Sequence, residues 1–234
     1  MKNLRGTYVH RGDAMRARQS RKRIFIALGF VTALGVVAAG HRPAPTDALA
    51  AETEGSTFGF SLTSNASLRS ELETTKGQLD LLRAQMDRAD RIISYSGRFN
   101  VPADIATPVY DIAQAEGIDP ELAFRLVSLE SDFNPHARSP VGAIGLTQVM
   151  PSTAHFFDKN LRAEHLADPK TNLRIGFRYL RTLMHNYNGN VKLALLAYNR
   201  GEVAVARALK SGVNPTNGYD RIVMKGYKGK GIVD

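Results

Sequence analysis

A single carboxylate at the end of an apolar helix is the feature of this 234-residue sequence best suited to acid–base chemistry. Asp119 and Pro120 mark a helix start, because Asp is a favoured N-cap and Pro is favoured at the first helical position. Leu126 lies four residues before Glu130, so a period of 3.6 residues puts both on one face. Glu130 is therefore expected on the buried face of a helix over residues 119–131.

The surroundings expected for Glu130 favour its protonated form. Asn134 and Pro135 end the helix, so Glu130 lies in the last turn, where the helix dipole and burial both raise the pKa of a carboxyl group. A carboxylic acid that keeps its proton near neutral pH can protonate the leaving oxygen of a glycosidic bond. The alternative is a structural role, in which Glu130 faces solvent or pairs with Arg125 or Arg138.

Two further segments place neutral polar side chains beside turns. In residues 142–151, two glycines precede Gln148, whose amide can both donate to and accept from a sugar. In residues 197–201, Tyr198 offers a phenol for a carboxylate and Asn199 offers an amide for an N-acetyl group. Taken singly, each segment is equally consistent with a tight turn or a helix cap.

In this order, the segments resemble the SLT-type lytic transglycosylases, lysozyme-like enzymes that cleave the glycan strands of peptidoglycan. The resemblance covers about residues 98–227. Residues 130–131 match the family's Glu-Ser pair, residues 145–148 are similar to its Gly-Leu-Met-Gln, and residues 197–199 match its Ala-Tyr-Asn. Thr147 stands where Met is commonest in the family, so a changed contact in one sugar subsite is expected.

The resemblance implies catalysis by one carboxylate, without metal or cofactor. Glu130 would protonate the bond between N-acetylmuramic acid and N-acetylglucosamine. It would then act as base on the 6-hydroxyl of the sugar, which leaves a 1,6-anhydro end. Tyr198 is expected to donate a hydrogen bond to this carboxylate. The residues expected to orient Glu130 or to bind substrate are Ser131, Gln148, Tyr198, Asn199 and, at the end of the family pattern, Tyr219.

Two other activities stay open: a hydrolytic muramidase of the same fold and a glycan-binding scaffold without activity. A conventional glycosidase needs a second carboxyl group near the first. Asp132 is two residues after Glu130 and so points to another side of the helix. The sequence contains no Cys, which excludes a thiolate metal site. Its histidines lack the His-Glu-x-x-His spacing, which argues against a zinc peptidase.

The N-terminal region carries most of the formal net charge of +9. Residues 1–23 form a basic tail, and residues 24–40 form an uncharged apolar run at the lower length limit for a transmembrane helix. Basic residues before such a run keep the N-terminus in the cytoplasm. This predicts a single-pass anchor in the bacterial inner membrane with a periplasmic catalytic domain, and argues against nucleic-acid binding. A buried helix is the alternative, and residues 48–50 have the form of a cleavage site.

The next segments are expected to link the anchor to the domain. Residues 41–66 lack an apolar period and are interpreted as a flexible spacer. Residues 67–97 are expected to form a helix with a heptad repeat of apolar residues, which predicts a coiled-coil homodimer. The alternative is an amphipathic helix folded back on the domain. The repeat consists of Leu68, Leu72, Thr75, Leu79, Leu82, Met86, Ala89 and Ile93.

From residue 98 to residue 227 the sequence predicts an all-α, lysozyme-like domain, because no segment alternates as a half-buried strand should. The glycine- and lysine-rich residues 228–234 are expected to form a flexible basic tail. Helices are predicted over residues 102–116, 119–131, 151–158, 168–187, 190–198 and 202–210.

Overall fold

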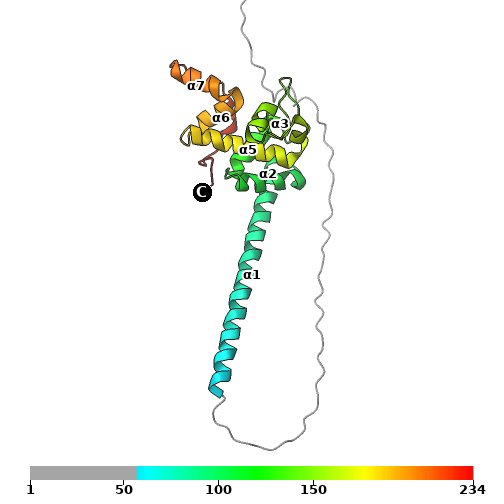
Figure 1. The fold of residues 1–234 in the computed structure, drawn as a ribbon, viewed down its shortest axis with the longest axis vertical. Coiled ribbons are helices and arrows are strands. Elements are labelled where there is room, and N and C mark those ends of the chain that lie inside the picture. Colours follow the sequence, from blue (N-terminus) through cyan, green and yellow to red (C-terminus); the bar gives the residue numbers. More distant parts are fainter. Residues whose placement is uncertain (1–56, 234) are drawn as a thin grey trace, which may run out of the picture. The chain divides into compact units, whose positions relative to one another are not determined.

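The computed structural model describes residues 57–233, and these residues are mostly helical (Figure 1). The predicted all-α class is confirmed for them. The predicted tail over residues 1–23 and the anchor over residues 24–40 lie outside the described residues. The elements are α1 (Thr57–Phe99), α2 (Ala103–Ala115), α3 (Pro120–Ser131), α4 (Pro151–Phe157), the 3-10 helix η1 (Ala163–Ala167), α5 (Pro169–Asn186), α6 (Val191–Arg200), α7 (Glu202–Lys210) and α8 (Tyr219–Val223).

Helix α1 is longer than the predicted helix over residues 67–97. It begins at Thr57, so part of the expected spacer over residues 41–66 is helical. Extending an existing helix is much less costly than starting one, which explains why polar residues without helical periodicity join it. In the part of the chain that the structure describes, no helix is both long enough and apolar enough to cross a membrane.

Two compact units divide the described chain between Gln85 and Met86, within α1. The second unit contains the last turns of α1, which the sequence placed outside the domain. Ile92 is 6% exposed, and the ring of Tyr95 stacks on Phe124 with a centroid distance of 4.6 Å. The domain therefore begins at Met86 rather than at residue 98. The heptad pattern concealed this, because the residues that contact the domain lie off the repeat.

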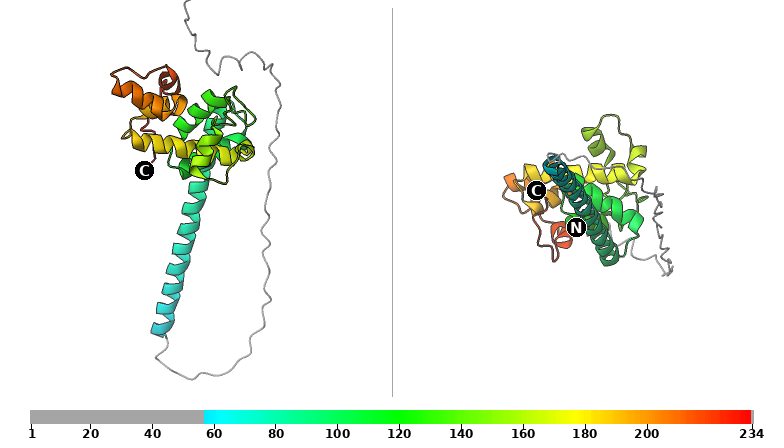
Figure 2. Two further views of the ribbon diagram at one scale, coloured as in Figure 1. Left: turned by 45° about the horizontal axis from the view of Figure 1, so that its top comes forward. Right: turned by 90° about the horizontal axis from the view of Figure 1, so that it is seen from below.

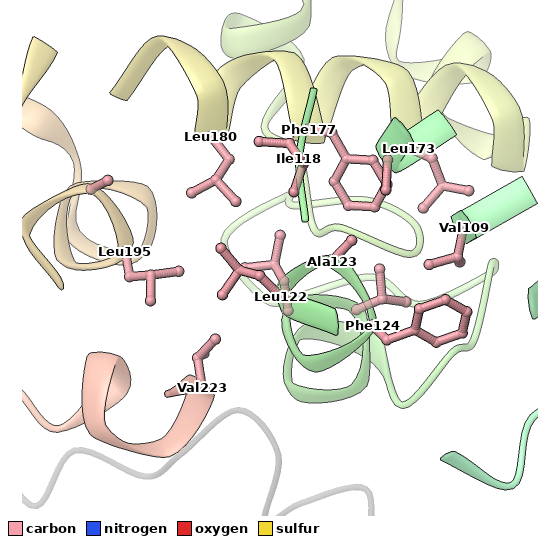
Figure 3. Packing of buried hydrophobic residues seen from close by; sticks show 14 of the residues in the cluster. Val109, Ile118, Leu122, Ala123, Phe124, Leu173, Phe177, Leu180, Leu195 and Val223 are labelled. Carbon is pink, nitrogen blue, oxygen red and sulfur yellow. The ribbon is translucent and has the colours of Figure 1, made fainter. Parts of the chain in front are cut away.

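Helix α3 occupies the centre of this second unit. Leu122, Ala123 and Phe124 are fully buried. Figure 3 shows their side chains among residues from four other helices: Val109 of α2, Leu173, Phe177 and Leu180 of α5, Leu195 of α6 and Val223 of α8. Because α3 is packed on several sides, the position of its C-terminal end is fixed by the core.

Helix α5 packs against several of the other helices of the unit. It contacts α2 and α6, and also the shorter α4 and η1 (Figure 2). Its N-cap is Asp168, whose side chain accepts a hydrogen bond from the N–H of Thr171 at 2.8 Å. A second, smaller apolar cluster lies under α4 and η1 and includes Leu166 and Ile175. This cluster supports the segment that precedes α4.

Residues 227–233 form a strap that is held by hydrogen bonds, which contradicts the flexible tail expected from residue 228 onward for the residues that the structure describes. The Asp119 N–H donates to the Gly231 carbonyl at 2.9 Å. The buried Tyr227 hydroxyl donates to the Asp119 carboxylate at 2.6 Å and accepts from the Gly231 N–H at 2.8 Å. The strap therefore ties α8 to the start of α3. Its glycines and lysines show no periodicity, so these contacts left no signal in the sequence.

Candidate active site

Glu130 and Tyr219 form the centre of the site. Glu130 lies in the last turn of α3 and is 8% exposed. Tyr219 is the first residue of α8 and is 4% exposed, and its hydroxyl donates a hydrogen bond to Oε1 of Glu130 at 2.5 Å. A hydrogen bond to an ionised carboxylate is short and strong. The acid predicted from the sequence is therefore buried, as expected, and held by a phenol.

The chain turns sharply after Glu130. Asp132 and Phe133 both adopt left-handed backbone conformations, with φ of 51° and 59°, so the helix ends at Ser131, as predicted, ahead of Asn134 and Pro135. Phe133 turns back into the core, while Asp132 is exposed. The neighbouring carboxylate thus lies in solvent, in agreement with the expectation that it does not share the site.

Ser131 holds α3 in place. The side chain is buried, and its hydroxyl lies 2.8 Å from the carbonyl oxygen of Leu146 and 3.2 Å from that of Val127. Since a hydroxyl carries one proton, both contacts use the same donor. Of the two roles expected for Ser131, the geometry favours orienting Glu130 over contacting substrate.

Thr147 belongs to a buried polar cluster, so any change that it makes in a sugar subsite would act through the position of its neighbours. Thr147 and Asn172 are both 0% exposed. The N–H and the hydroxyl of Thr147 donate to Oδ1 of Asn172 at 2.9 and 2.7 Å, and Nδ2 of Asn172 donates to the Ile144 carbonyl at 2.8 Å. Gly176 lies so close that a Cβ there would overlap the Thr147 side chain. The small Thr replaces the commoner Met within the core.

The Gln148 side chain is held by its amide nitrogen. Its Nε2 donates to the carbonyl oxygens of Gly145 and Ala137 at 2.9 and 3.2 Å, and its backbone has a φ of 49°. These bonds fix the side chain and leave Oε1 as the atom that can accept from a sugar hydroxyl or amide. The sequence predicted a sugar contact for Gln148, and the geometry is compatible with it.

Tyr198 does not donate the hydrogen bond to the Glu130 carboxylate that the sequence predicted. Its hydroxyl donates to the backbone carbonyl of Thr147 at 2.8 Å, while Tyr219 donates to the carboxylate. Burial raises the pKa of the Tyr198 hydroxyl well above its ordinary value, and the nearby charge of Glu130 is the second-largest cause. The phenol therefore stays protonated, and it joins α6 to the segment before α4.

Asn217 was not among the predicted site residues, yet it connects two of them. Its Nδ2 donates to Oδ1 of Asn199 at 2.8 Å, and its Oδ1 accepts from the N–H of Tyr219 at 3.2 Å. The bridge sets the start of α8 and so the position of the phenol. The available signal was an Asn directly before Gly218, a pair typical of turns. Asn199 keeps its Nδ2 as a donor for a ligand.

The site as a whole offers one carboxyl group, two phenols and two amides. In the described part of the chain, no three His, Asp or Glu side chains come together as metal ligands. Such a set can move a proton at one carboxyl oxygen and hold hydroxyl and amide groups of a sugar.

Residues 108–217 match the family model described as Transglycosylase SLT domain. The match contains Glu130, Gln148, Tyr198 and Asn199, and it ends just before Tyr219. The phenol on the carboxylate therefore lies outside the matched region, and its role comes from the structure.

Several named proteins are similar to parts of the chain. A transglycosylase of Enterobacteria phage PRD1 is 43% identical over 84 residues, which are 36% of this chain and 30% of that protein. Membrane-bound lytic murein transglycosylase C of Haemophilus ducreyi is 33% identical over 128 residues, 49% of this chain and 34% of that protein. The 70 kDa soluble lytic transglycosylase of Escherichia coli superposes with a TM-score of 0.46 at 27% identity, covering 56% of this chain and 24% of that one. The chain thus spans about a third or less of the length of these relatives.

Proposed function

We propose that this chain, whose residues 108–217 match the transglycosylase SLT domain model, is a lytic transglycosylase that cleaves the glycan strands of peptidoglycan. The observation that carries the proposal is the buried carboxyl group of Glu130, which accepts a hydrogen bond from Tyr219 at 2.5 Å. A buried carboxyl group is well suited to general acid catalysis, because burial disfavours its ionised form. The proposed domain is lysozyme-like and extends from Met86 through the C-terminal strap.

In the first step, Glu130 protonates the oxygen between N-acetylmuramic acid and N-acetylglucosamine. The bond from that oxygen to the anomeric carbon breaks, and its electron pair goes to the oxygen. The N-acetyl group of the substrate stabilises the positive charge that develops on the anomeric carbon. Glu130 is now ionised, and the hydroxyl of Tyr219 stabilises it because a hydrogen bond to a carboxylate is stronger than one to the neutral acid.

In the second step, Glu130 acts as the base. It removes the proton of the 6-hydroxyl of the muramic acid, and the freed oxygen bonds to the anomeric carbon. The product carries a 1,6-anhydro ring, Glu130 regains its proton, and no water is consumed. One carboxyl group is sufficient for both steps, in keeping with the exposed position of Asp132.

The remaining residues bind the sugars or hold the acid in place. Gln148 accepts from a sugar hydroxyl or amide through Oε1, and Asn199 donates through Nδ2. Ser131 and Tyr198 do not contact the substrate. Each donates to a backbone carbonyl of the segment before α4. Their contribution is to set the distance between Glu130 and that segment.

The proposed location is the periplasmic side of the bacterial inner membrane, where peptidoglycan lies. Residues 24–40 would be a single-pass anchor and residues 1–23 its cytoplasmic tail. The support is the basic residues before an uncharged apolar run. One of the similar proteins is also named as membrane-bound.

The test is digestion of purified peptidoglycan by the full-length chain in detergent, followed by mass spectrometry of the products. Wild type should release anhydro-muropeptides, and Glu130→Gln should release none, because an amide cannot deliver the proton. Asp132→Asn is the matched control, since it neutralises an exposed carboxylate two residues away, and should keep full activity. Products with reducing ends would identify a muramidase. Binding without products in the wild type would indicate a scaffold.

A further inference from the structure

We propose that α1 pairs with α1 of a second copy of this chain in a parallel, in-register, two-stranded coiled coil. The inference does not depend on the proposed activity. Its first support is the exposure of the heptad repeat in α1. The large apolar residues of the repeat are each 46–66% exposed, and they are Leu68, Leu72, Leu79, Leu82, Met86 and Ile93. Together with Thr75 and Ala89, they form the seam of α1.

Within the unit that begins at Met86, the seam residues of α1 stay exposed. Among the last turns of α1, Ile92 and Tyr95 contact the core of the domain. Met86 and Ile93 are each 66% exposed, since a period of 3.6 residues turns them to a different side of the helix. In these turns the seam therefore stays exposed beside the domain-facing side of α1, which begins at the neighbouring Ile92.

The seam is narrow, which favours two strands. In heptad notation Leu72, Leu79, Met86 and Ile93 take position a, and Leu68, Thr75, Leu82 and Ala89 take position d. The e positions that flank it are all charged, and they are Arg69, Lys76, Arg83 and Asp90. Larger bundles bury the flanking positions, whereas a two-stranded coiled coil leaves them at the edge in water.

The charges beside the seam select the parallel orientation. In a parallel pair, Glu71 at position g of one chain lies beside Lys76 at position e of the other, and the symmetry gives this ion pair twice. In an antiparallel pair aligned over the whole seam, e positions meet instead, and the repulsion between Lys76 and Arg83 offsets the attraction between Arg69 and Asp90, so the charges contribute no net stabilisation. In the single chain, Lys76 contacts Glu73 at 2.9 Å. Both side chains are exposed, so exchanging this partner costs little.

Parallel pairing agrees with the proposed anchor. Both N-termini would lie at one end of the coiled coil, as two chains held by the same membrane require. Thr75 and Ala89 fill position d poorly, which weakens the pair in solution. Anchoring raises the local concentration of the chains, so a modest affinity is sufficient at the membrane. The two catalytic domains of one dimer would then act on neighbouring glycan strands.

Single cysteines can test the orientation, because the chain contains no Cys. The full-length chain in detergent is oxidised mildly with Leu72→Cys or Met86→Cys, each near one end of the seam. A parallel, in-register pair brings identical residues together, within the Cα distance of about 4.4–6.8 Å that a disulfide spans. Each variant should therefore form disulfide-linked dimers by itself. Leu81→Cys is the matched control, because Leu81 is 60% exposed but lies off the seam; it should stay monomeric under the same oxidation.

The other outcomes overturn the proposal. A cross-link that appears only when the Leu72→Cys and Ala89→Cys chains are mixed would show antiparallel pairing, in which a positions face d positions of the partner. Equal cross-linking of Leu81→Cys would show random collision. Sedimentation equilibrium of the wild type gives an independent reading, and a monomer mass at every concentration would remove the coiled coil.

A charge exchange tests the ion pair that sets the orientation. Glu71→Lys puts a lysine beside Lys76 of the other chain at both symmetry-related contacts. Lys76→Glu puts a glutamate beside Glu71 at the same two contacts. Each single change should raise the dimer dissociation constant by about 10-fold, and the double exchange should restore it. If the dissociation constant of the double variant instead rises by the product of the two single effects, the assigned register would be contradicted.

Discussion

The hydroxyl of Tyr219 lies 2.5 Å from Oε1 of Glu130, although 89 residues separate them in the sequence. This bond joins the central helix α3 to the short helix α8, which contacts α3 and α6. The bridge from Asn217 to Asn199 and the C-terminal strap both hold α8 in place. The position of one donor on the acid thus depends on three separate parts of the chain.

Tyr219→Phe removes this donor and leaves the ring. The ionised carboxylate loses stabilisation, so the proton is held more tightly and the alkaline limb of the pH–activity profile should move to higher pH. Turnover should fall by about 10- to 100-fold, because the ionised form is the one that follows the first step. Rates of anhydro-muropeptide release between pH 4 and pH 9 measure both effects.

Tyr198→Phe is the control for that experiment, because its hydroxyl donates to the Thr147 carbonyl and not to the acid. It should lower stability by about 1 kcal/mol and leave the pH limb in place. Equal shifts in the two variants would mean that Tyr219 has no specific role at the carboxylate.

Gly176→Ala tests the close packing of the buried Thr147 cluster. A Cβ at residue 176 would overlap the Thr147 side chain, so the variant should lose about 1–3 kcal/mol of stability despite its better helix propensity. Gly97→Ala is the matched control in a helix of the same unit, since nothing lies within 4 Å of its added Cβ. It should gain about 0.5–1 kcal/mol. Thermal unfolding of the two variants should therefore show shifts of opposite sign.

Asp168→Ala tests the N-cap of α5 and its pH dependence. The hydrogen bonds from Thr171 lower the pKa of the Asp168 carboxyl group. The stabilisation is complete above the unfolded pKa, near 4, and is lost as the pH falls through the folded pKa. At pH 7 the variant should be less stable by about 1 kcal/mol. Unfolding curves at descending pH should converge with those of the wild type, and a constant difference down to pH 2 would contradict the assignment.

The helices were predictable from the sequence because their signals are local. Asp119 is confirmed as an N-cap, and Asp168 and Asn190, which begin two of the predicted helices, also cap the first turn through side-chain hydrogen bonds. The 3-10 helix η1, by contrast, has no apolar period and was not predicted. Boundaries that depend on caps were therefore located to within a few residues.

The site was predictable only in its outline. Glu130 follows from helix periodicity, but the partner of its carboxylate depends on where α8 packs, which no local pattern records. The same holds for Thr147, whose side chain lies in the core because Asn172 and Gly176 meet it across the unit. Interactions between distant segments therefore determine that Tyr219, and not Tyr198, donates to Glu130.

The N-terminal boundary of the domain provides the last prediction. The stack of Tyr95 on Phe124 and the burial of Ile92 place the end of α1 within the core. A fragment of residues 86–233 should therefore unfold at the same temperature as the domain in the full-length chain. A fragment of residues 98–233 loses both side chains, each worth about 1.5–3 kcal/mol when buried, and should be less stable by about 4 kcal/mol. Circular dichroism during heating measures this difference, and equal melting of the two fragments would return the boundary to residue 98.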